Sequence, residues 1–214
     1  MARSKLYDKQ EFTRLYLWRH PEVLGGTEGI VYGHTDTALS SEGAKQLEGI
    51  AAYMSDKKVS AIYGSDLQRS HLVAQAVGGG QQPSREPIVD KDLRELFLGQ
   101  WEGLSYQTLR EQYPEEMKAR WDDLAGYRVP GGESLTDLAR RVAPAFERII
   151  EGNRGGRVCV IGHAGVNRVF LAGLLGMPLE RIFRLDQAYA CLNLIDVFDD
   201  GVPLVRTLNQ KIIS

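Results

Sequence analysis

The chain has 214 residues, of which 43% are hydrophobic and 25% are charged, and its formal net charge is −2 at pH 7. This balance is typical of a globular protein and excludes a disordered, collagen-like or disulfide-built chain. No basic excess points to a nucleic-acid partner, and the apolar stretches are shorter than the roughly 18 residues of a membrane-spanning helix, so we expect neither nucleic acid nor membrane as a partner.

Residues 1–13 are polar and lack the apolar stretch of a secretory signal peptide. No linker, internal repeat or shift in composition divides the rest of the chain. We therefore predict a polar N-terminal extension over residues 1–13 and a single domain over residues 14–214. Cys159 and Cys191 each lie in an apolar run, which is typical of buried free thiols in a reducing compartment, so a cytoplasmic location is expected.

The succession of apolar runs and helical patterns predicts strands that alternate with helices. In the first half of the chain the predicted elements are a strand over 14–18, a glycine-rich loop over 24–37, a helix from Ser40 or Ser41 to about 54, a strand over 59–63, a helix capped by Ser65, and a strand over 87–90. In the second half they are one or two helices over 105–124 broken near Pro114, a turn over 130–134, a helix over 135–150, a strand over 157–161, a helix over 166–175, and strands over 192–198 and 202–208.

Ser134 and Asp137 resemble a capping box at the start of the helix over 135–150. The order of the elements as a whole predicts an α/β fold. We expect a three-layer α/β/α sandwich with a mostly parallel sheet and a C-terminal antiparallel hairpin.

Polar side chains follow three of the predicted strands. Arg19 and His20 end the first strand, Ser65 ends the second and leads to Arg69, and His163 ends the strand over 157–161. Because ligands bind beyond the carboxyl ends of parallel strands, we expect these side chains to meet at one edge of the sheet. The loop after the third strand adds the carboxylate Glu95.

This set of side chains suits phosphoryl transfer. Two arginines provide forked donors that match phosphate oxygens at any physiological pH. Their positive charge favours a neutral histidine, which is the nucleophilic form, and a protonated carboxyl can donate to a leaving alkoxide. The arginines would then replace a metal ion, so we expect neither metal nor other cofactor, and the reaction would pass through a phosphohistidine.

The residues resemble the signature of the histidine phosphatase superfamily, which includes the cofactor-dependent phosphoglycerate mutases. The similarity runs from about residue 15 to residue 209 and is carried by six short motifs in the family's order. These motifs are Arg19-His20-Pro21-Glu22, Ser65-Asp-Leu-Gln-Arg69, Leu93-Arg-Glu95, Gly99-Gln-Trp-Glu-Gly103, Gly132-Glu-Ser134 and Ile161-Gly-His163-Ala-Gly165.

The resemblance implies a role for each of these polar residues. By that resemblance His20 is the nucleophile, and Arg19, Arg69 and His163 form the phosphate pocket, with His163 also contacting the transferring group. Glu95 is the implied proton donor and the activator of water, with Glu22, Glu102 and Glu133 as alternatives near the same mouth.

The sequence departs from the family pattern close to the nucleophile. Pro21 stands where the family has glycine, Val23 where threonine is common, and Gly26 where an asparagine often lies. One phosphate contact is therefore unassigned. The glycine-rich loop offers Thr27, His34 and Thr35 as replacements, and we count His34 and Thr35 among the predicted substrate-binding residues.

Within the superfamily the chain is most similar to alpha-ribazole phosphatases of cobalamin biosynthesis, through Tyr32-Gly-His-Thr-Asp36 and Phe183-Arg-Leu-Asp-Gln187. We predict a metal-independent phosphatase of a small phosphomonoester, with alpha-ribazole 5′-phosphate as one candidate substrate. A phosphoglycerate mutase and a non-catalytic phosphate-binding protein are the alternatives. The helices over 105–124 are expected to cover the mouth and to select substrates through Arg110, Lys118 or Arg120, and homodimer formation is left open.

Overall fold

The computed structural model describes residues 11–212, and within them six strands form one sheet in the order β3-β2-β4-β1-β5-β6. The strands are β1 (Phe12–Arg19), β2 (Ala61–Gly64), β3 (Ile88–Val89), β4 (Arg157–Gly162), β5 (Cys191–Phe198) and β6 (Pro203–Lys211). Strands β3, β2, β4 and β1 are parallel to one another, whereas β5 is antiparallel to both β1 and β6. The predicted mostly parallel sheet with a C-terminal antiparallel hairpin is confirmed.

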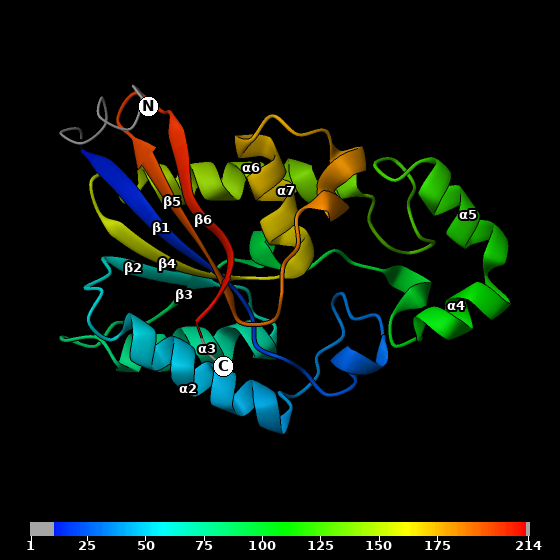
Figure 1. Ribbon diagram of the computed structural model, residues 1–214, viewed down its shortest axis with the longest axis horizontal. Helices are drawn as coiled ribbons and strands as arrows, with labels where there is room; N and C mark the ends of the chain where they lie inside the picture. Colours follow the sequence, from blue (N-terminus) through cyan, green and yellow to red (C-terminus); the bar gives the residue numbers. More distant parts are fainter. Residues whose placement is uncertain (1–10, 213–214) are drawn as a thin grey trace.

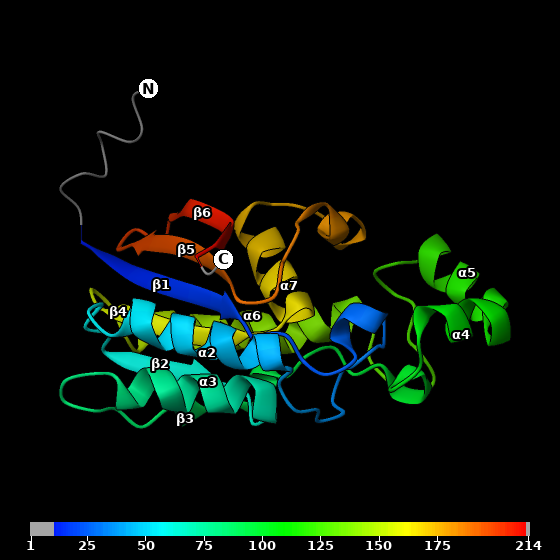
Figure 2. The ribbon, with the colours of Figure 1, turned by 60° about the horizontal axis from the view of Figure 1, so that its bottom comes forward.

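Helices cover both faces of the sheet (Figure 1). On one face lie α2 (Ser41–Met54) and α3 (Gln68–Gly79), and on the other lie α6 (Leu135–Glu151) and α7 (Ala164–Leu174). This arrangement confirms the three-layer sandwich. Two further helices, α4 (Tyr106–Gln112) and α5 (Pro114–Asp122), are set apart from the sandwich, as Figures 1 and 2 show. Short 3₁₀ helices occur at Gly26–Glu28, Lys91–Leu93, Gly99–Trp101 and Leu179–Arg184.

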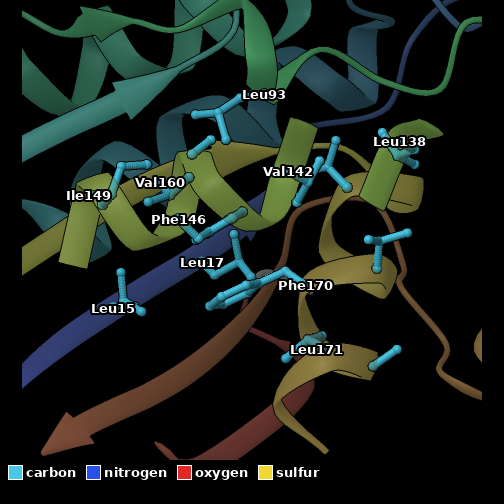
Figure 3. Packing of buried hydrophobic residues seen from close by; sticks show 14 of the residues in the cluster. Leu15, Leu17, Leu93, Leu138, Val142, Phe146, Ile149, Val160, Phe170 and Leu171 are labelled. Atoms are coloured by element: carbon cyan, nitrogen blue, oxygen red, sulfur yellow. The ribbon is translucent and has the colours of Figure 1, made fainter. Parts of the chain in front are cut away.

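Alternating side chains of the central strand β1 build the two cores. Leu15 and Leu17 point into the core beneath α6 and α7, and Tyr16 and Trp18 point into the core beneath α2 and α3. This is the period of two that a strand buried on both faces requires. In the first core, shown in Figure 3, the rings of Phe146 and Phe170 stack with their centroids 3.7 Å apart and join α6 to α7.

The long helix α6 begins at the predicted capping box. The Ser134 hydroxyl accepts the Asp137 N–H at 3.1 Å, and the Asp137 carboxylate accepts the Ser134 N–H at 2.9 Å. Pro144 lies inside this helix. The apolar side of the helix is buried against the sheet, as its sequence periodicity predicts.

Several predicted boundaries differ from the structure; the strand expected over 59–63, for example, spans Ala61–Gly64. Strand β1 begins at Phe12, so residues 12–13 belong to the sheet, while residues 1–10 of the predicted extension lie outside the described residues. The helix after β2 is capped by Leu67, not by Ser65, because the Ser65 hydroxyl faces His163 instead. Helix α7 begins at Ala164, directly after that histidine, and two residues earlier than the pattern indicates.

Both cysteines, Cys159 and Cys191, are buried and free, as predicted. Burial raises the pKa of the Cys191 thiol to about 11, which keeps it protonated and unreactive near neutral pH. None of the helices within residues 11–212 has the length and apolar character needed to cross a membrane.

Candidate active site

The carboxyl ends of β1, β4 and β2 lie side by side at one edge of the sheet. Arg19 is in register with Gly162, and Gly64 with Ile161, so the residues that follow these strands are neighbours. The His20 N–H donates to the Gly162 carbonyl at 3.0 Å. The rings of His20 and His163 lie 5.0 Å apart, centroid to centroid, although 143 positions separate them in the chain. The predicted meeting of the two imidazoles is confirmed.

A cavity of about 650 Å³ opens at this edge of the sheet. Its inner wall includes Arg19, His20, Arg69 and Glu95, which come from or follow β1, the start of α3 and the loop after β3. Helices α4 and α5 form its outer wall. The structure thus brings four of the predicted site residues to one cavity, with His163 buried directly behind His20.

The His20 imidazole is held in one tautomer. Its Nδ1 lies 2.7 Å from the Pro21 carbonyl oxygen, and since a carbonyl can only accept, Nδ1 carries the proton. The lone pair is therefore on Nε2. Burial, together with the charges of Arg19 and Arg69, holds the pKa of His20 well below its usual value. A neutral imidazole with a free Nε2 is the nucleophilic form.

His163 is fully buried, and its Nε2 lies 2.8 Å from the Ser65 hydroxyl. Burial and the charge of Arg69 lower the pKa of His163 well below its usual value. Among the described residues its Nδ1 has no hydrogen-bond partner, although that atom is buried. Since buried polar atoms are nearly always paired, this nitrogen marks a place for a polar ligand atom.

Two arginines surround the histidines. The Arg69 side chain is buried and donates to the carbonyls of Gly33 at 2.6 Å and Thr35 at 2.9 Å. Arg19 donates to the Gln187 carbonyl at 2.5 Å. Within residues 11–212 neither guanidinium forms an ion pair with a carboxylate. Two positive charges, one buried on Arg69 and one half-buried on Arg19, neither of them in an ion pair, form a site that favours an anion.

The Glu95 carboxylate lies at the start of α7. The Gly165 N–H donates to its two oxygens at 3.1 and 3.0 Å, and the Leu96 N–H donates at 2.8 Å. A Cβ at position 165 would lie 2.4 Å from Glu95 Oε1, so any larger residue there would displace the Glu95 carboxylate.

The three alternative carboxylates have other partners. Glu22 accepts from the Ser40 hydroxyl, Glu102 from the N–H groups of the loop over 24–37, and Glu133 from Arg141. None of the three lines the main cavity that the described residues form. Glu95 is the carboxylate in its wall.

The structure does not bring His34 and Thr35 to the wall of this cavity. Their N–H groups donate to Glu102 at 2.9 and 2.7 Å, and the Thr35 carbonyl accepts from Arg69. The His34 ring stacks on Phe97 and its Nε2 donates to the Glu95 carbonyl at 2.9 Å. Both residues therefore hold Arg69 and Glu95 in place from behind. A loop without periodicity gave no signal of which way its side chains point.

Sequence reasoning missed Tyr189. Its ring lies beneath the Arg19 guanidinium, 3.7 Å from Cζ to the centroid, and 5.6 Å from the His20 ring. A Cβ at Gly26 would lie 2.3 Å from the Tyr189 hydroxyl, so this hydroxyl occupies the space of a side chain at position 26. No local pattern links two positions so far apart in the chain. The contact explains why position 26 is glycine.

Of the three positively charged residues predicted to select substrates, two line the cavity and one does not. Arg110 and Arg120 line the cavity, together with Arg168 from α7, which sequence reasoning did not single out. Lys118 lies outside the cavity and pairs with Asp122 on the exposed side of α5. Within the described part of the chain, no group of three or more His, Cys, Asp or Glu side chains is arranged to hold a metal ion.

The sequence and the fold of this chain are similar to those of known proteins. The model of the histidine phosphatase superfamily (branch 1) matches residues 15–211. The bifunctional protein Rv2228c of Mycobacterium tuberculosis is 32% identical over 199 residues, which cover 92% of this chain and 54% of that protein. The chain thus spans about half the length of that relative.

Two further relatives match over almost their whole length. The adenosylcobalamin/alpha-ribazole phosphatase of Escherichia coli is 28% identical over 203 residues, which cover 94% of this chain and 98% of that protein. Among solved structures, YhfR of Bacillus stearothermophilus superimposes with a TM-score of 0.84 at 27% identity, covering 93% of this chain and 98% of that one.

Proposed function

This chain belongs to the histidine phosphatase superfamily, and from its site we propose that it hydrolyses phosphomonoesters through a phosphohistidine formed on His20. The observation that carries the proposal is the state of His20. Its neutral imidazole has a free Nε2 and faces a cavity that also presents two arginines, neither of which is in an ion pair with a carboxylate of residues 11–212.

In the first step, His20 Nε2 attacks phosphorus, and the bond from phosphorus to the leaving-group oxygen breaks. Glu95 acts as the general acid and gives a proton to that oxygen, so the product leaves as an alcohol. Arg19 and Arg69 bind the phosphoryl oxygens and stabilise the charge that develops on them, and so does the orphaned Nδ1 of His163 in the tautomer in which the Ser65 hydroxyl donates to Nε2 and Nδ1 carries the proton.

In the second step, water attacks the phosphohistidine and gives a proton to the Glu95 carboxylate. The nitrogen–phosphorus bond breaks, inorganic phosphate leaves, and His20 regains its lone pair. The arginines supply the positive charge that a metal ion supplies in other phosphatases. We propose the Tyr189 hydroxyl as the phosphate contact that the family's asparagine would make from position 26.

The test is turnover of para-nitrophenyl phosphate in the presence of EDTA. We expect undiminished turnover in the chelator, and a loss of roughly 10⁴-fold or more in kcat for His20→Ala. His71→Ala is the matched control, because His71 lies on α3 and does not line the cavity. A chelator-sensitive activity that added metal restores would contradict the mechanism.

For the substrate, we propose a small-metabolite phosphomonoester, with alpha-ribazole 5′-phosphate as the first compound to assay. The name of the Escherichia coli relative supports this choice. Phosphoglycerate mutase activity is the second candidate, since other relatives carry that name. Release of free phosphate that exceeds interconversion of 2- and 3-phosphoglycerate supports the hydrolase, and the opposite ratio supports the mutase.

A further inference from the structure

Arg120 is a charged residue of the cavity wall that the proposed reaction does not use. It lies on α5, and its Nη1 is buried without a hydrogen-bond partner among the described residues. The carboxylate one turn before it on the helix, Glu116, is the usual partner for such an arginine. Glu116 instead accepts from Gln100 at 2.8 Å and from Trp101 Nε1 at 3.1 Å.

No carboxylate within residues 11–212 forms an ion pair with the Arg120 guanidinium, which lies over the ring of Trp101 at 5.9 Å from the centroid. An arginine stays charged at physiological pH, and a charge removed from water without a partner is costly. The missing negative charge is therefore one that a ligand in the cavity can supply.

The charge of the whole cavity points to the same conclusion. Its lining includes one carboxylate, Glu95, and five arginines, namely Arg19, Arg69, Arg110, Arg120 and Arg168. A phosphomonoester dianion offsets two of these positive charges. The remainder favours a ligand with more negative charge than a single phosphate carries.

Arg120 and His20 lie on different walls of the cavity. His20 is at the edge of the sheet, whereas α5 lies in the part of the molecule set apart from the sandwich (Figures 1 and 2). The remaining lining is rich in apolar groups and includes Trp101, Trp121 and Phe183, of which the last two face each other at 5.9 Å. A cavity of about 650 Å³ also has room for a leaving group larger than a three-carbon acid.

We propose that Arg120 binds a second anionic group, a carboxylate or a phosphate, on the leaving group of a phosphomonoester substrate whose apolar body lies between the two walls. This inference rests on the proposed function and ranks substrates within it. A substrate with an uncharged leaving group leaves Arg120 without a counter-ion, so we expect a phosphorylated carboxylic acid or a bisphosphate to be preferred.

The test compares two substrates that differ in one charge: a naphthyl phosphate that bears a carboxylate on its second ring, and the corresponding carboxamide. In the wild-type protein we expect kcat/KM to favour the carboxylate. Arg120→Met should lower kcat/KM for the carboxylate by about 10- to 100-fold and that for the carboxamide by less than about threefold. Arg120→Lys should restore part of the preference.

Lys118→Met is the matched control, because it removes the same charge from the same helix but outside the cavity. It should leave the preference unchanged. Equal kcat/KM values for the two substrates in the wild-type protein, or an equal loss on both in Arg120→Met, would overturn the inference while leaving the hydrolase intact. Failure to cleave either substrate would instead count against the proposed function.

A second measurement needs no variant. Inorganic phosphate and naphthoate should be able to bind the wild-type protein at the same time, because they occupy separate parts of one cavity. Naphthalene carboxamide should bind more weakly than naphthoate. Mutually exclusive inhibition by phosphate and naphthoate would show that the carboxylate takes the phosphate pocket, and would contradict the assignment of Arg120. The same experiment with naphthyl phosphonate in place of naphthoate compares the two inhibitors, and the tighter one shows whether a phosphate-like group or a carboxylate is the preferred second anion.

Discussion

At the scale of single residues, the site depends on keeping an imidazole neutral beside positive charge. The Pro21 carbonyl fixes the proton of His20 on Nδ1, and the Ser65 hydroxyl occupies Nε2 of His163. These two contacts leave one nitrogen of each ring without a partner among the residues that the structure describes. The free nitrogens have opposite tasks in the proposed reaction, since one attacks phosphorus and the other binds a phosphoryl oxygen.

Tyr189→Phe tests the phosphate contact proposed for the Tyr189 hydroxyl, which lies where a side chain at position 26 would be. The substitution keeps the ring beneath Arg19 and removes one hydrogen-bond donor. We expect the Kd of inorganic phosphate to rise by about 10-fold, the effect of losing one hydrogen bond to a charged group. Isothermal titration calorimetry measures it, with Tyr53→Phe on α2 as the control. An unchanged Kd would remove Tyr189 from the phosphate site.

That five residues lie together at this edge of the sheet could be predicted from sequence, because strand ends and short motifs mark them: Arg19, His20, Arg69, Glu95 and His163. Their partners could not be found in this way. Tyr189 reaches the site from a loop far along the chain, and the orphaned nitrogen of Arg120 becomes evident only when its neighbour Glu116 is seen to bind elsewhere. Such facts depend on side-chain direction, which periodicity does not report in loops and short helices.

At the scale of elements, helix α6 positions the segment that carries Glu95. Arg141 on this helix donates to the carbonyls of Asp92, Arg94 and Glu95 at 2.6–2.8 Å. The same guanidinium forms a paired contact with both oxygens of Glu133 at 2.8 Å. The planar fork of an arginine can satisfy these partners together, and a lysine cannot.

We expect Arg141→Lys to lower kcat more than it changes KM, because Glu95 loses its support while the phosphate pocket stays intact. The free energy of unfolding should fall by roughly 2 kcal/mol, since several partly buried acceptors lose their donor. Steady-state kinetics and urea unfolding measure the two effects. Arg140→Lys, at an exposed position one residue earlier, should change neither. A rise in KM at constant kcat would assign Arg141 to substrate binding instead.

Strands and helices with a clear period were predictable at this scale, and α6 was predictable down to its capping box. The ends of elements were less so, because they depend on tertiary partners. Strand β1 extends to Phe12 where the ring packs on Phe198 of β5. The 3₁₀ helix over Leu179–Arg184 has no strong pattern, and it contributes Ile182 and Phe183 to the cavity.

At the scale of the whole molecule, the parallel order of β2, β4 and β1 creates the site. It places three polar strand ends together at the cost of burying two imidazoles near two guanidiniums. The alternation of strands and helices made this arrangement predictable. Helices α4 and α5 then close the cavity from outside the sandwich, as was expected of the helices over 105–124.

The buried imidazoles make stability depend on pH. Their pKa values are lowered well below 6.5 in the folded protein, so between those values and about pH 6.5 the unfolded chain binds protons that the folded one does not. The free energy of unfolding should therefore fall as the pH decreases from 7 to 5, by up to about 1.4 kcal/mol per pH unit for each histidine.

Urea unfolding across this pH range measures the dependence, and the double variant His20→Gln, His163→Gln should show a flatter one. An equal slope in the double variant would show that other groups control the pH dependence of stability.

The lowered pKa of His20 also affects the pH dependence of activity. The pH at which kcat/KM falls on the acid side should lie below the ordinary histidine range, because His20 stays neutral there.

The central claim is that His20 carries the phosphoryl group, and trapping the intermediate tests it most directly. The protein is mixed with a fast aryl phosphate substrate, quenched in alkali, in which phosphohistidine survives, and digested for mass spectrometry. We predict one added phosphoryl group on the peptide that contains His20, lost when the substrate is exhausted and absent from His20→Ala. Turnover with no phosphoryl group on that histidine, or with one on another side chain, would contradict the account.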